Sequence, residues 1–177
     1  MRIFIGVAFS TKTKESLYEL QRSWLDHAVS KKPTLYNNIH LTLKFIGELN
    51  ENEIEDLKHS LDEHLQNQKS FNIKIGDIGS FIKDDKEIVW AGITDGKKTL
   101  MALQSVIVKA ISNANIITKK EKYNPHITLA REVLFLDGIH TLPLINTVET
   151  IKKVTMFRSH RIKDILTYTP IYEFELH

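Results

Sequence analysis

The sequence predicts a mixed fold of helices and strands in which two similar halves form two lobes. Residues 39–43 and 125–129 each carry a histidine, His40 or His126, with a threonine two residues later in an alternating strand pattern. The two histidines lie 86 residues apart, and at that offset both halves contain a strand, a helix and a histidine strand in the same order. Such repetition implies lobes related by a pseudo-two-fold axis, with the histidine strands facing each other. Other identities at this offset are Gly6 with Gly92, Lys12 with Lys98, Thr13 with Thr99, Leu17 with Leu103, Ala28 with Ala114 and Asn38 with Asn124.

Length and composition favour an ordinary globular protein. The 177 residues fit one domain, 1–177, made of two interleaved lobes that share a core. The net charge of +2 does not by itself indicate a nucleic-acid partner. The chain has no cysteine, which excludes disulfides, a thiol nucleophile and cysteine-ligated zinc.

Neither a secretory signal nor a membrane span is predicted. The apolar stretch at residues 1–9 is too short for a signal peptide, and no apolar run reaches the length of a membrane span. We therefore expect a cytoplasmic protein with no membrane partner. We also expect it to be a monomer.

The first half begins with a dense apolar run at residues 3–9, which predicts a buried strand. Hydroxyls at residues 10–13 can cap the helix that follows. We expect this helix to end at residues 31–33, because the residue before a proline avoids the helical region. The first histidine strand then continues to a turn at Gly47. The apolar stripe of the helix consists of Leu17, Leu20, Trp24 and Ala28.

A second helix is expected after a cap at Asn50 or Asn52, and a third before the second histidine strand. Between them, residues 71–75 and 88–93 predict two strands, with a bend or bulge at residues 76–79. The stripes of the two helices are Ile54, Leu57, Leu61 and Leu65, and Leu100, Leu103, Ile107 and Ile111.

The end of the chain is less regular. Residues 136–150 contain glycine, proline and threonine with little periodicity, and we expect a long, partly helical connection there. Two strands, at residues 152–159 and 165–176, are expected to close the fold.

The two motifs can carry out chemistry on a phosphodiester. Alternation places His40 and Thr42 on one face of their strand, and His126 and Thr128 on one face of theirs. Because imidazole titrates near neutral pH, one histidine can act as a base while the other acts as an acid. The threonine hydroxyls can donate to the non-bridging oxygens of a phosphate. This scheme needs neither a metal nor another cofactor.

Other interpretations remain open from the residues alone. A single His-x-Thr on a strand is usually structural, although two copies in repeated registers favour a shared site. Zinc binding competes, because imidazoles are common ligands, but no third ligand lies at suitable spacing from His40 or His126. Lys44, which alternation places on the face of His40, either attracts a phosphate or solvates the end of the strand.

With both motifs identified, the sequence resembles the two-histidine (2H) phosphoesterase superfamily, and within it the RNA 2',3'-cyclic phosphodiesterases first named 2'-5' RNA ligases. The matching segments are HLTLKFIGE at residues 40–48 and PHITLAR at residues 125–131. Further similarities are Arg2 with Phe4, Gly79 with Phe81 before Val89 and Trp90, and Ser159 followed by Tyr168.

The resemblance implies an α+β fold in which two antiparallel sheets flank a central cleft and helices lie outside. It also implies metal-independent hydrolysis of the 2',3'-cyclic phosphate end of RNA or an oligonucleotide to a 2'-phosphomonoester. His40 resembles the general acid that protonates the leaving 3' oxygen, and His126 the base that activates water. Thr42 and Thr128 would bind the phosphate.

Three further residues are candidates for substrate contact by the same resemblance. Arg131 matches the arginine that closes the second signature, although strict strand alternation turns it away from His126. Many relatives carry a tryptophan where this chain has Tyr36, and a basic residue where it has residues 121–123. Tyr36 or Tyr123 either replaces a base-stacking surface or belongs to the core.

We therefore predict a phosphoric diester hydrolase acting on RNA 2',3'-cyclic phosphate ends. The same chemistry would cleave or form 2',5' linkages. A non-catalytic protein that binds RNA ends through these side chains, and a metallohydrolase, are the alternatives from other classes.

Overall fold

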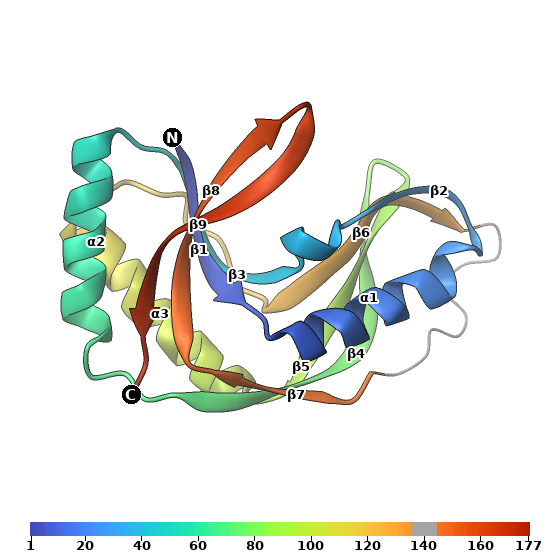
Figure 1. Cartoon of the computed structure of the whole chain (residues 1–177), viewed down its shortest axis with the longest axis horizontal. Helices are drawn as coiled ribbons and strands as arrows, with labels where there is room; N and C mark the ends of the chain where they lie inside the picture. The colour runs from blue at the N-terminus through green and yellow to red at the C-terminus, as the bar shows by residue number, and fades with distance from the viewer. Residues whose placement is uncertain (136–144) are drawn as a thin grey trace.

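The computed structural model describes residues 1–135 and 145–177, and over these ranges the chain forms three α-helices, one short 3-10 helix and nine strands (Figure 1). The strands form two antiparallel sheets, with the orders β3-β1-β8-β9 and β2-β6-β5-β4-β7. The α+β class with two antiparallel sheets is therefore confirmed. In chain order the elements are β1 (Arg2–Ala8), α1 (Thr11–Leu25), β2 (Ala28–Pro33), η1 (Tyr36–Asn38), β3 (His40–Glu48), α2 (Glu51–Leu65), β4 (Phe71–Lys83), β5 (Lys86–Asp95), α3 (Lys97–Asn113), β6 (His126–Phe135), β7 (Thr147–Ile151), β8 (Lys153–Ile162) and β9 (Ile165–Glu175).

The helices lie outside the sheets, as expected. In Figure 1, α1 is on one side of the molecule, whereas α2 and α3 pack against each other on the other side. Helix α1 follows a strand of the four-stranded sheet but packs against β2, β6 and β7 of the five-stranded sheet. Conversely, α3 follows β5 of the five-stranded sheet and packs against β3 of the other, as well as against β4 of its own. This exchange ties the two sheets together.

The first helix is shorter than predicted. It ends at Leu25, and Ala28 begins β2. Ala28 is 8% exposed because it pairs with Phe135 of β6, not because it continues the helical stripe. The predicted helix end at residues 31–33 is therefore wrong, since strand pairing overrides the local helical period. The remaining stripe residues, Leu17, Leu20 and Trp24, are buried as predicted.

The second helix begins at one of the two predicted caps. The side chain of Asn50 accepts a hydrogen bond from the Glu53 N–H at 2.9 Å, and the Glu53 carboxylate accepts from the Asn50 N–H at 2.8 Å. This capping box satisfies two N–H groups that the helix itself leaves unpaired. The apolar stripes predicted for α2 and α3 are confirmed, since each of their residues is at most 3% exposed.

The bulge predicted at residues 76–79 is confirmed. Ile75 pairs with Ile93 and Ile78 with Ala91, so β4 has one more residue than β5 between these pairs.

The closing strands are confirmed as β8 and β9. Of the connection predicted at residues 136–150, residues 136–144 lie outside the described residues. Its last part was predicted wrongly, because Thr147–Ile151 forms β7, which pairs with β4. This segment is a strand because it pairs with β4, not because of any helical periodicity in its sequence.

The spacing of the repeat differs between elements. Helices α1 and α3 begin 86 residues apart, like the two histidines. The strands before them do not keep this spacing, since Thr42 pairs with Gly6 whereas Thr128 pairs with Trp90, 84 residues beyond Gly6. Gly6 and Gly92 are therefore not at equivalent positions in the two sheets. Relative to the paired threonine, α3 begins two residues later than α1 does.

Candidate active site

The two histidine motifs lie on strands that contact each other although they belong to different sheets. Strand β3 carries His40 and Thr42, and β6 carries His126 and Thr128. These four residues are partly exposed, whereas the apolar residues that alternate with them are buried. The structure therefore brings the two strands that carry the motifs into contact, and a shared cleft for the four side chains stays a prediction.

Each imidazole is held through Nδ1 by the carbonyl of the residue two positions earlier. The distances are 2.7 Å from His40 to Asn38 and 2.8 Å from His126 to Asn124. Because a carbonyl only accepts, Nδ1 carries a hydrogen in both rings, and Nε2 is left to exchange protons. In His40, Nε2 accepts a hydrogen bond from the Thr42 hydroxyl at 2.9 Å. Neither asparagine was predicted as a site residue, although the two match in the repeat.

The side chain of Asn38 fixes the entry to β3. It is 6% exposed, and its amide donates to the Leu166 carbonyl at 2.7 Å. Its side-chain oxygen accepts from the Tyr168 N–H at 3.1 Å. Asn38 thereby fastens η1 to β9 next to the imidazole that its own carbonyl orients.

Aromatic rings enclose His40. Ring centroids of Phe4, Tyr168 and Phe157 lie 4.9, 5.0 and 6.0 Å from its ring. Removal from water lowers the pKa of His40 from 6.5 to about 4, and the hydrogen bond to Asn38 opposes this only in part. Near neutral pH the free protein therefore holds His40 as a neutral imidazole.

Positive charges converge on the same imidazole. Arg131 and Lys14 add to the lowering of the His40 pKa, and His126 does so when it carries a proton. Lys14 comes from α1 and was not predicted, because no local pattern distinguishes it from other helix lysines. Together these groups make the cleft favourable for an anion.

His126 is flanked by aromatic residues of the five-stranded sheet. Phe81 meets it edge-on at 5.2 Å, and the centroid of Trp90 lies 6.4 Å away. Gly79 pairs with Trp90, and a Cβ at this position would lie only 2.4 Å from the indole. The glycine therefore provides the space in which Trp90 packs beside the motif.

A β-bulge places Arg131 on the side of the cleft. In β6 one extra residue, Leu129, lies between the pairs that Thr128 and Ala130 make with β5. Leu129 and Ala130 are both fully buried, so alternation resumes with Arg131 on the face that carries His126. The orientation expected from strict alternation is therefore wrong. The same kind of register shift follows the first motif in β3.

Polar groups from outside β6 hold this bulge. The carbonyl of Leu129 accepts from the Thr34 N–H at 2.8 Å and from the Gln21 side chain at 2.6 Å. The Thr34 hydroxyl donates to the carbonyl of Thr128 at 2.9 Å. Gln21 is 1% exposed and also donates to the Thr34 carbonyl at 2.9 Å. In the sequence, this role of Gln21 is indicated only by its position, as a polar residue on the buried side of α1.

A cavity of about 400 Å³, here called the β3–β6 cavity, opens beside Thr42 and His126. Lys44 lines it and donates through Nζ to the carbonyl of Lys119 at 2.5 Å. Tyr123 also lines it, and its hydroxyl donates to the carbonyl of Thr42 at 3.2 Å. Burial raises the pKa of Tyr123 well above its usual range. The other lining residues are Leu43, Phe45, Phe81, Glu121, Lys122 and Asn124.

Tyr36 is placed differently from Tyr123. Its ring meets Tyr18 of α1 edge-on at 5.6 Å, and it does not line the β3–β6 cavity. Of the two tyrosines predicted as base-stacking candidates, the structure brings only Tyr123 to this cavity.

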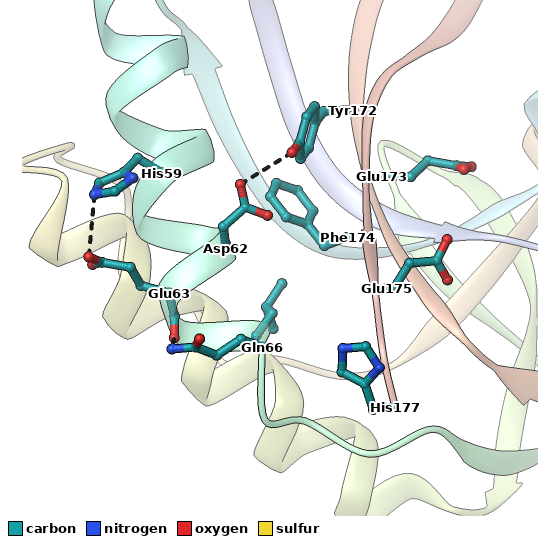
Figure 2. A pocket seen from close by; sticks show the side chains of 10 residues that line it. His59, Asp62, Glu63, Gln66, Tyr172, Glu173, Phe174, Glu175 and His177 are labelled. Carbon is teal, nitrogen blue, oxygen red and sulfur yellow. Dashed lines mark hydrogen bonds and ion pairs between the residues drawn. The ribbon is translucent and has the colours of Figure 1, made fainter.

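A second cavity, of about 470 Å³, lies between α2 and β9 and contains none of the predicted site residues (Figure 2). His59 pairs there with Glu63 at 3.3 Å, and the Tyr172 hydroxyl donates to Asp62 at 3.3 Å. Glu173 and Glu175 also line it. This acidic lining repels a phosphate, in contrast to the cleft at the motifs.

Over residues 1–135 and 145–177, no three His, Cys, Asp or Glu side chains are arranged to hold a metal ion. Within the same ranges, none of the helices has the length and apolar character needed to span a bilayer.

Comparison with known proteins gives the family. The model of the 2'-5' RNA ligase superfamily matches residues 11–137, which include both motifs. The RNA 2',3'-cyclic phosphodiesterase of Bacillus subtilis is 30% identical over 140 residues, which cover 77% of this chain and 76% of that protein. The protein of the same name from Methanocaldococcus jannaschii is 28% identical over 181 residues, covering 98% and 97%.

Solved structures share the fold. The apo form of Escherichia coli LigT superposes with a TM-score of 0.84 at 20% identity, covering 99% of this chain and 96% of that one. The complex of LigT with 3'-AMP gives 0.82 at 21% identity, covering 99% and 97%. The family match over both motifs shows that the chain belongs to the 2'-5' RNA ligase superfamily, and these structures share its fold.

Proposed function

We propose that the protein hydrolyses RNA 2',3'-cyclic phosphate ends to 2'-phosphomonoesters, without a metal or another cofactor. The observation that carries the proposal is the pair of His-x-Thr motifs on contacting strands, each with Nδ1 fixed by a backbone carbonyl, which leaves Nε2 as the nitrogen that exchanges protons. The printed names of the relatives support the substrate, since those from Bacillus subtilis and Escherichia coli are RNA 2',3'-cyclic phosphodiesterases.

In the proposed reaction, Nε2 of His126 takes a proton from water as the water oxygen attacks phosphorus. The bond between phosphorus and the 3' oxygen breaks, and Nε2 of His40 gives a proton to that oxygen. The products are a 3'-hydroxyl and a 2'-phosphomonoester. Both imidazoles keep their Nδ1 hydrogen on a carbonyl throughout, which preserves their orientation.

The phosphate would lie between the two rings, where several donors and positive charges are available. The hydroxyl of Thr128 donates to a non-bridging oxygen. The Thr42 hydroxyl can do the same once His40 is protonated, because Nε2 then no longer accepts its hydrogen. Arg131 and Lys14 balance the charge of the phosphate. Lys44 and Tyr123 line the β3–β6 cavity beside the motifs, and the rest of the substrate would contact them there. All of these groups come from one chain, which supports action as a monomer, and we place the enzyme in the cytoplasm with its RNA.

His40 must gain a proton before it can act as the acid. Its pKa of about 4 makes it neutral in the free protein near neutral pH. A bound phosphate anion favours the charged imidazole and raises this pKa, so substrate binding itself prepares the acid.

Hydrolysis of a short RNA with a 2',3'-cyclic phosphate end tests the proposal. The wild type should form the 2'-phosphate in the presence of excess chelator. General acid or base catalysis contributes about 100- to 10,000-fold, so His40→Ala and His126→Ala should each lower kcat/KM by that order. His59→Ala is the matched control, because His59 lies on α2 in the other cavity, and it should retain activity.

Each alternative predicts a different result. Loss of turnover in chelator, restored by a divalent metal, would establish a metallohydrolase. RNA binding without turnover would establish a non-catalytic binder of RNA ends. Cleavage only of 2',5'-linked substrates would keep the site and change the bond on which it acts.

A further inference from the structure

One acidic side chain lies on the buried side of the five-stranded sheet. Glu149 of β7 is 8% exposed, and among the described residues it is the only Asp, Glu, Lys or Arg that is buried. It pairs with Ile73 of β4, which belongs to the hydrophobic core. In Figure 1, β7 passes the start of α1, against which it packs. A carboxylate in such a place needs hydrogen-bond donors.

The donors come from the start of α1. The Glu149 carboxylate accepts from the Ser10 N–H at 3.1 Å, from the Ser10 hydroxyl at 2.7 Å and from the buried hydroxyl of Thr13. The Ser10 hydroxyl in turn accepts from the Thr13 N–H at 3.3 Å and so caps the helix. The first turn of α1 contains no acidic residue of its own. The negative charge that favours a helix N-terminus is therefore supplied by β7.

The same turn of α1 carries Lys14 on the side of the cleft. Lys14, Tyr18 and Gln21 follow the spacing of one helix face. On this face, Tyr18 meets Tyr36 of η1, and Gln21 binds the bulge of β6. The charge of Lys14 also lowers the pKa of His40. Because a positive charge near a helix N-terminus opposes the helix dipole, helix stability alone does not account for a lysine at this position.

The backbone that carries Lys14 is tied to both sheets. The Lys14 N–H donates to the Ser10 carbonyl at 3.0 Å, at the first turn of the helix. Ser10 follows Ala8 by two residues, and Ala8 of β1 pairs with His40. The contacts of Glu149 add the tie to β7 of the five-stranded sheet. The position of Lys14 relative to His40 therefore depends on this carboxylate.

The second copy of the repeat lacks this arrangement. Thr99 of α3 matches Thr13 of α1 in the repeat, but Thr99 is exposed whereas Thr13 is 1% exposed. Helix α3 begins after Gly96, which makes no side-chain capping hydrogen bond. The contacts of Glu149 are thus particular to the helix that borders the cleft, and the repeat does not require them.

We propose that Glu149 is a positioning residue, which holds the first turn of α1 so that the Lys14 ammonium faces the phosphate between the two motifs. Glu149 does not touch the substrate, because its carboxylate is buried and occupied by Ser10 and Thr13. The inference rests on the proposed function. It adds that a strand outside both motifs sets how tightly the phosphate is bound.

NMR titration of the His40 imidazole tests the inference and requires neither turnover nor a bound ligand. Glu149→Met keeps the length of the side chain but removes every acceptor, so the first turn of α1 is no longer held. If Lys14 then moves away, the pKa of His40 should rise, as in Lys14→Ala. A direct effect of the lost carboxylate would have the opposite sign, because removal of a negative charge lowers the pKa of an imidazole.

A second variant keeps the charge of Glu149. Thr13→Val removes one buried donor with little change of shape, and it should also raise the pKa of His40, by less than Glu149→Met does. Ser60→Ala is the matched control, since Ser60 is 6% exposed and donates to the Ala110 carbonyl at 2.8 Å between α2 and α3. It should lower the midpoint of thermal unfolding and leave the His40 titration unchanged.

The affinity for inorganic phosphate gives an independent readout. Lys14→Ala and Glu149→Met should each weaken phosphate binding by about ten-fold, the size expected for one hydrogen bond to a charged group. In the Lys14→Ala background, Glu149→Met should change this affinity less than about two-fold, because both changes remove the same interaction. It should still lower the unfolding midpoint there. With the cyclic-phosphate RNA as substrate, KM should follow the phosphate affinity.

The outcomes separate the inference from the function on which it rests. An unchanged His40 titration in both Glu149→Met and Thr13→Val would overturn the inference. A loss of phosphate affinity that is equal with and without Lys14 would overturn it as well. If the wild type does not hydrolyse the RNA, the proposed function fails, and the His40 titration still decides the role of Glu149. If Glu149→Met does not fold, Thr13→Val decides it by the same measurements.

Discussion

The backbone carbonyl of Asn38 fixes Nδ1 of His40, while the Asn38 side chain fixes the neighbouring strand β9. One buried residue therefore sets both the tautomer of the imidazole and the position of the wall behind it. The second motif has the corresponding carbonyl at Asn124, but the side chain of Asn124 is exposed. The two motifs thus share the contact between Nδ1 and a backbone carbonyl and differ in the support behind it.

Replacing this support should affect catalysis more than substrate binding. Asn38→Ala keeps the carbonyl but removes the two partly buried hydrogen bonds of the side chain, which should lower the free energy of unfolding by about 1–3 kcal/mol. Because the ring of His40 is then less well oriented, kcat should fall more than KM rises. Asn124→Ala is the matched control and should change both quantities little. Urea unfolding and steady-state kinetics measure the two effects, and equal behaviour of the two variants would contradict the asymmetry.

The neutral state of His40 should make the stability of the protein depend on pH. Its pKa is about 4 when folded and near 6.5 when unfolded, so between these values the unfolded chain binds more protons. The contribution of neutral His40 to the free energy of unfolding is complete above pH 6.5 and is lost as the pH falls toward 4. It amounts to at most about 3 kcal/mol. His40→Gln should flatten the dependence of unfolding free energy on pH across this window, whereas His59→Gln should leave it as in the wild type. Parallel curves for wild type and His40→Gln would contradict the assignment.

Phosphate should reverse the shift at His40. An anion between the two rings stabilises the imidazolium, so the pKa of His40 should rise when inorganic phosphate is bound. NMR titration of the imidazole with and without phosphate measures this directly. A pKa that stays low in saturating phosphate would mean that His40 does not face the bound anion, and its role as the acid would be untenable.

Much of this molecule follows from local sequence patterns. The motifs, the cap at Asn50 and the apolar stripes of α2 and α3 depend on residues close together in the chain, and the structure has them where they were predicted. The end of α1 and the strand β7 could not be predicted, because pairing with distant strands decides them. Likewise Lys14 and Gln21 reach the site from a helix that carries no motif, and only the packing of α1 against β6 brings them there.

The bulge in β6 makes Arg131 a candidate for contact with the phosphate. Arg131→Ala should raise KM by about ten-fold or more, since a hydrogen bond to a charged group is worth about 1.5–3 kcal/mol. It should also raise the pKa of His40, because the charge of Arg131 contributes to its lowering. Lys86→Ala is the control, since Lys86 lines the same cavity of about 280 Å³ as Arg131 and carries the same charge. A loss of activity in Arg131→Ala without any change in the His40 titration would show that the arginine acts on the substrate elsewhere than at the motifs.

Gln21 should act on the site through the bulge and not by touching the substrate. Gln21→Met keeps the volume of the side chain but leaves the Thr34 carbonyl without its donor and the Leu129 carbonyl with one donor fewer. We expect a loss of about 1–3 kcal/mol in unfolding free energy, and a fall in kcat that Gln21→Glu does not rescue, because a carboxylate cannot donate to these carbonyls. Since Gln21 carries no charge, the pKa of His40 should change less than in Arg131→Ala. If Gln21→Met loses stability but keeps the wild-type kcat, the bulge holds its shape without Gln21, and the position of Arg131 depends on the pairing of β6 with β2 and β5 alone.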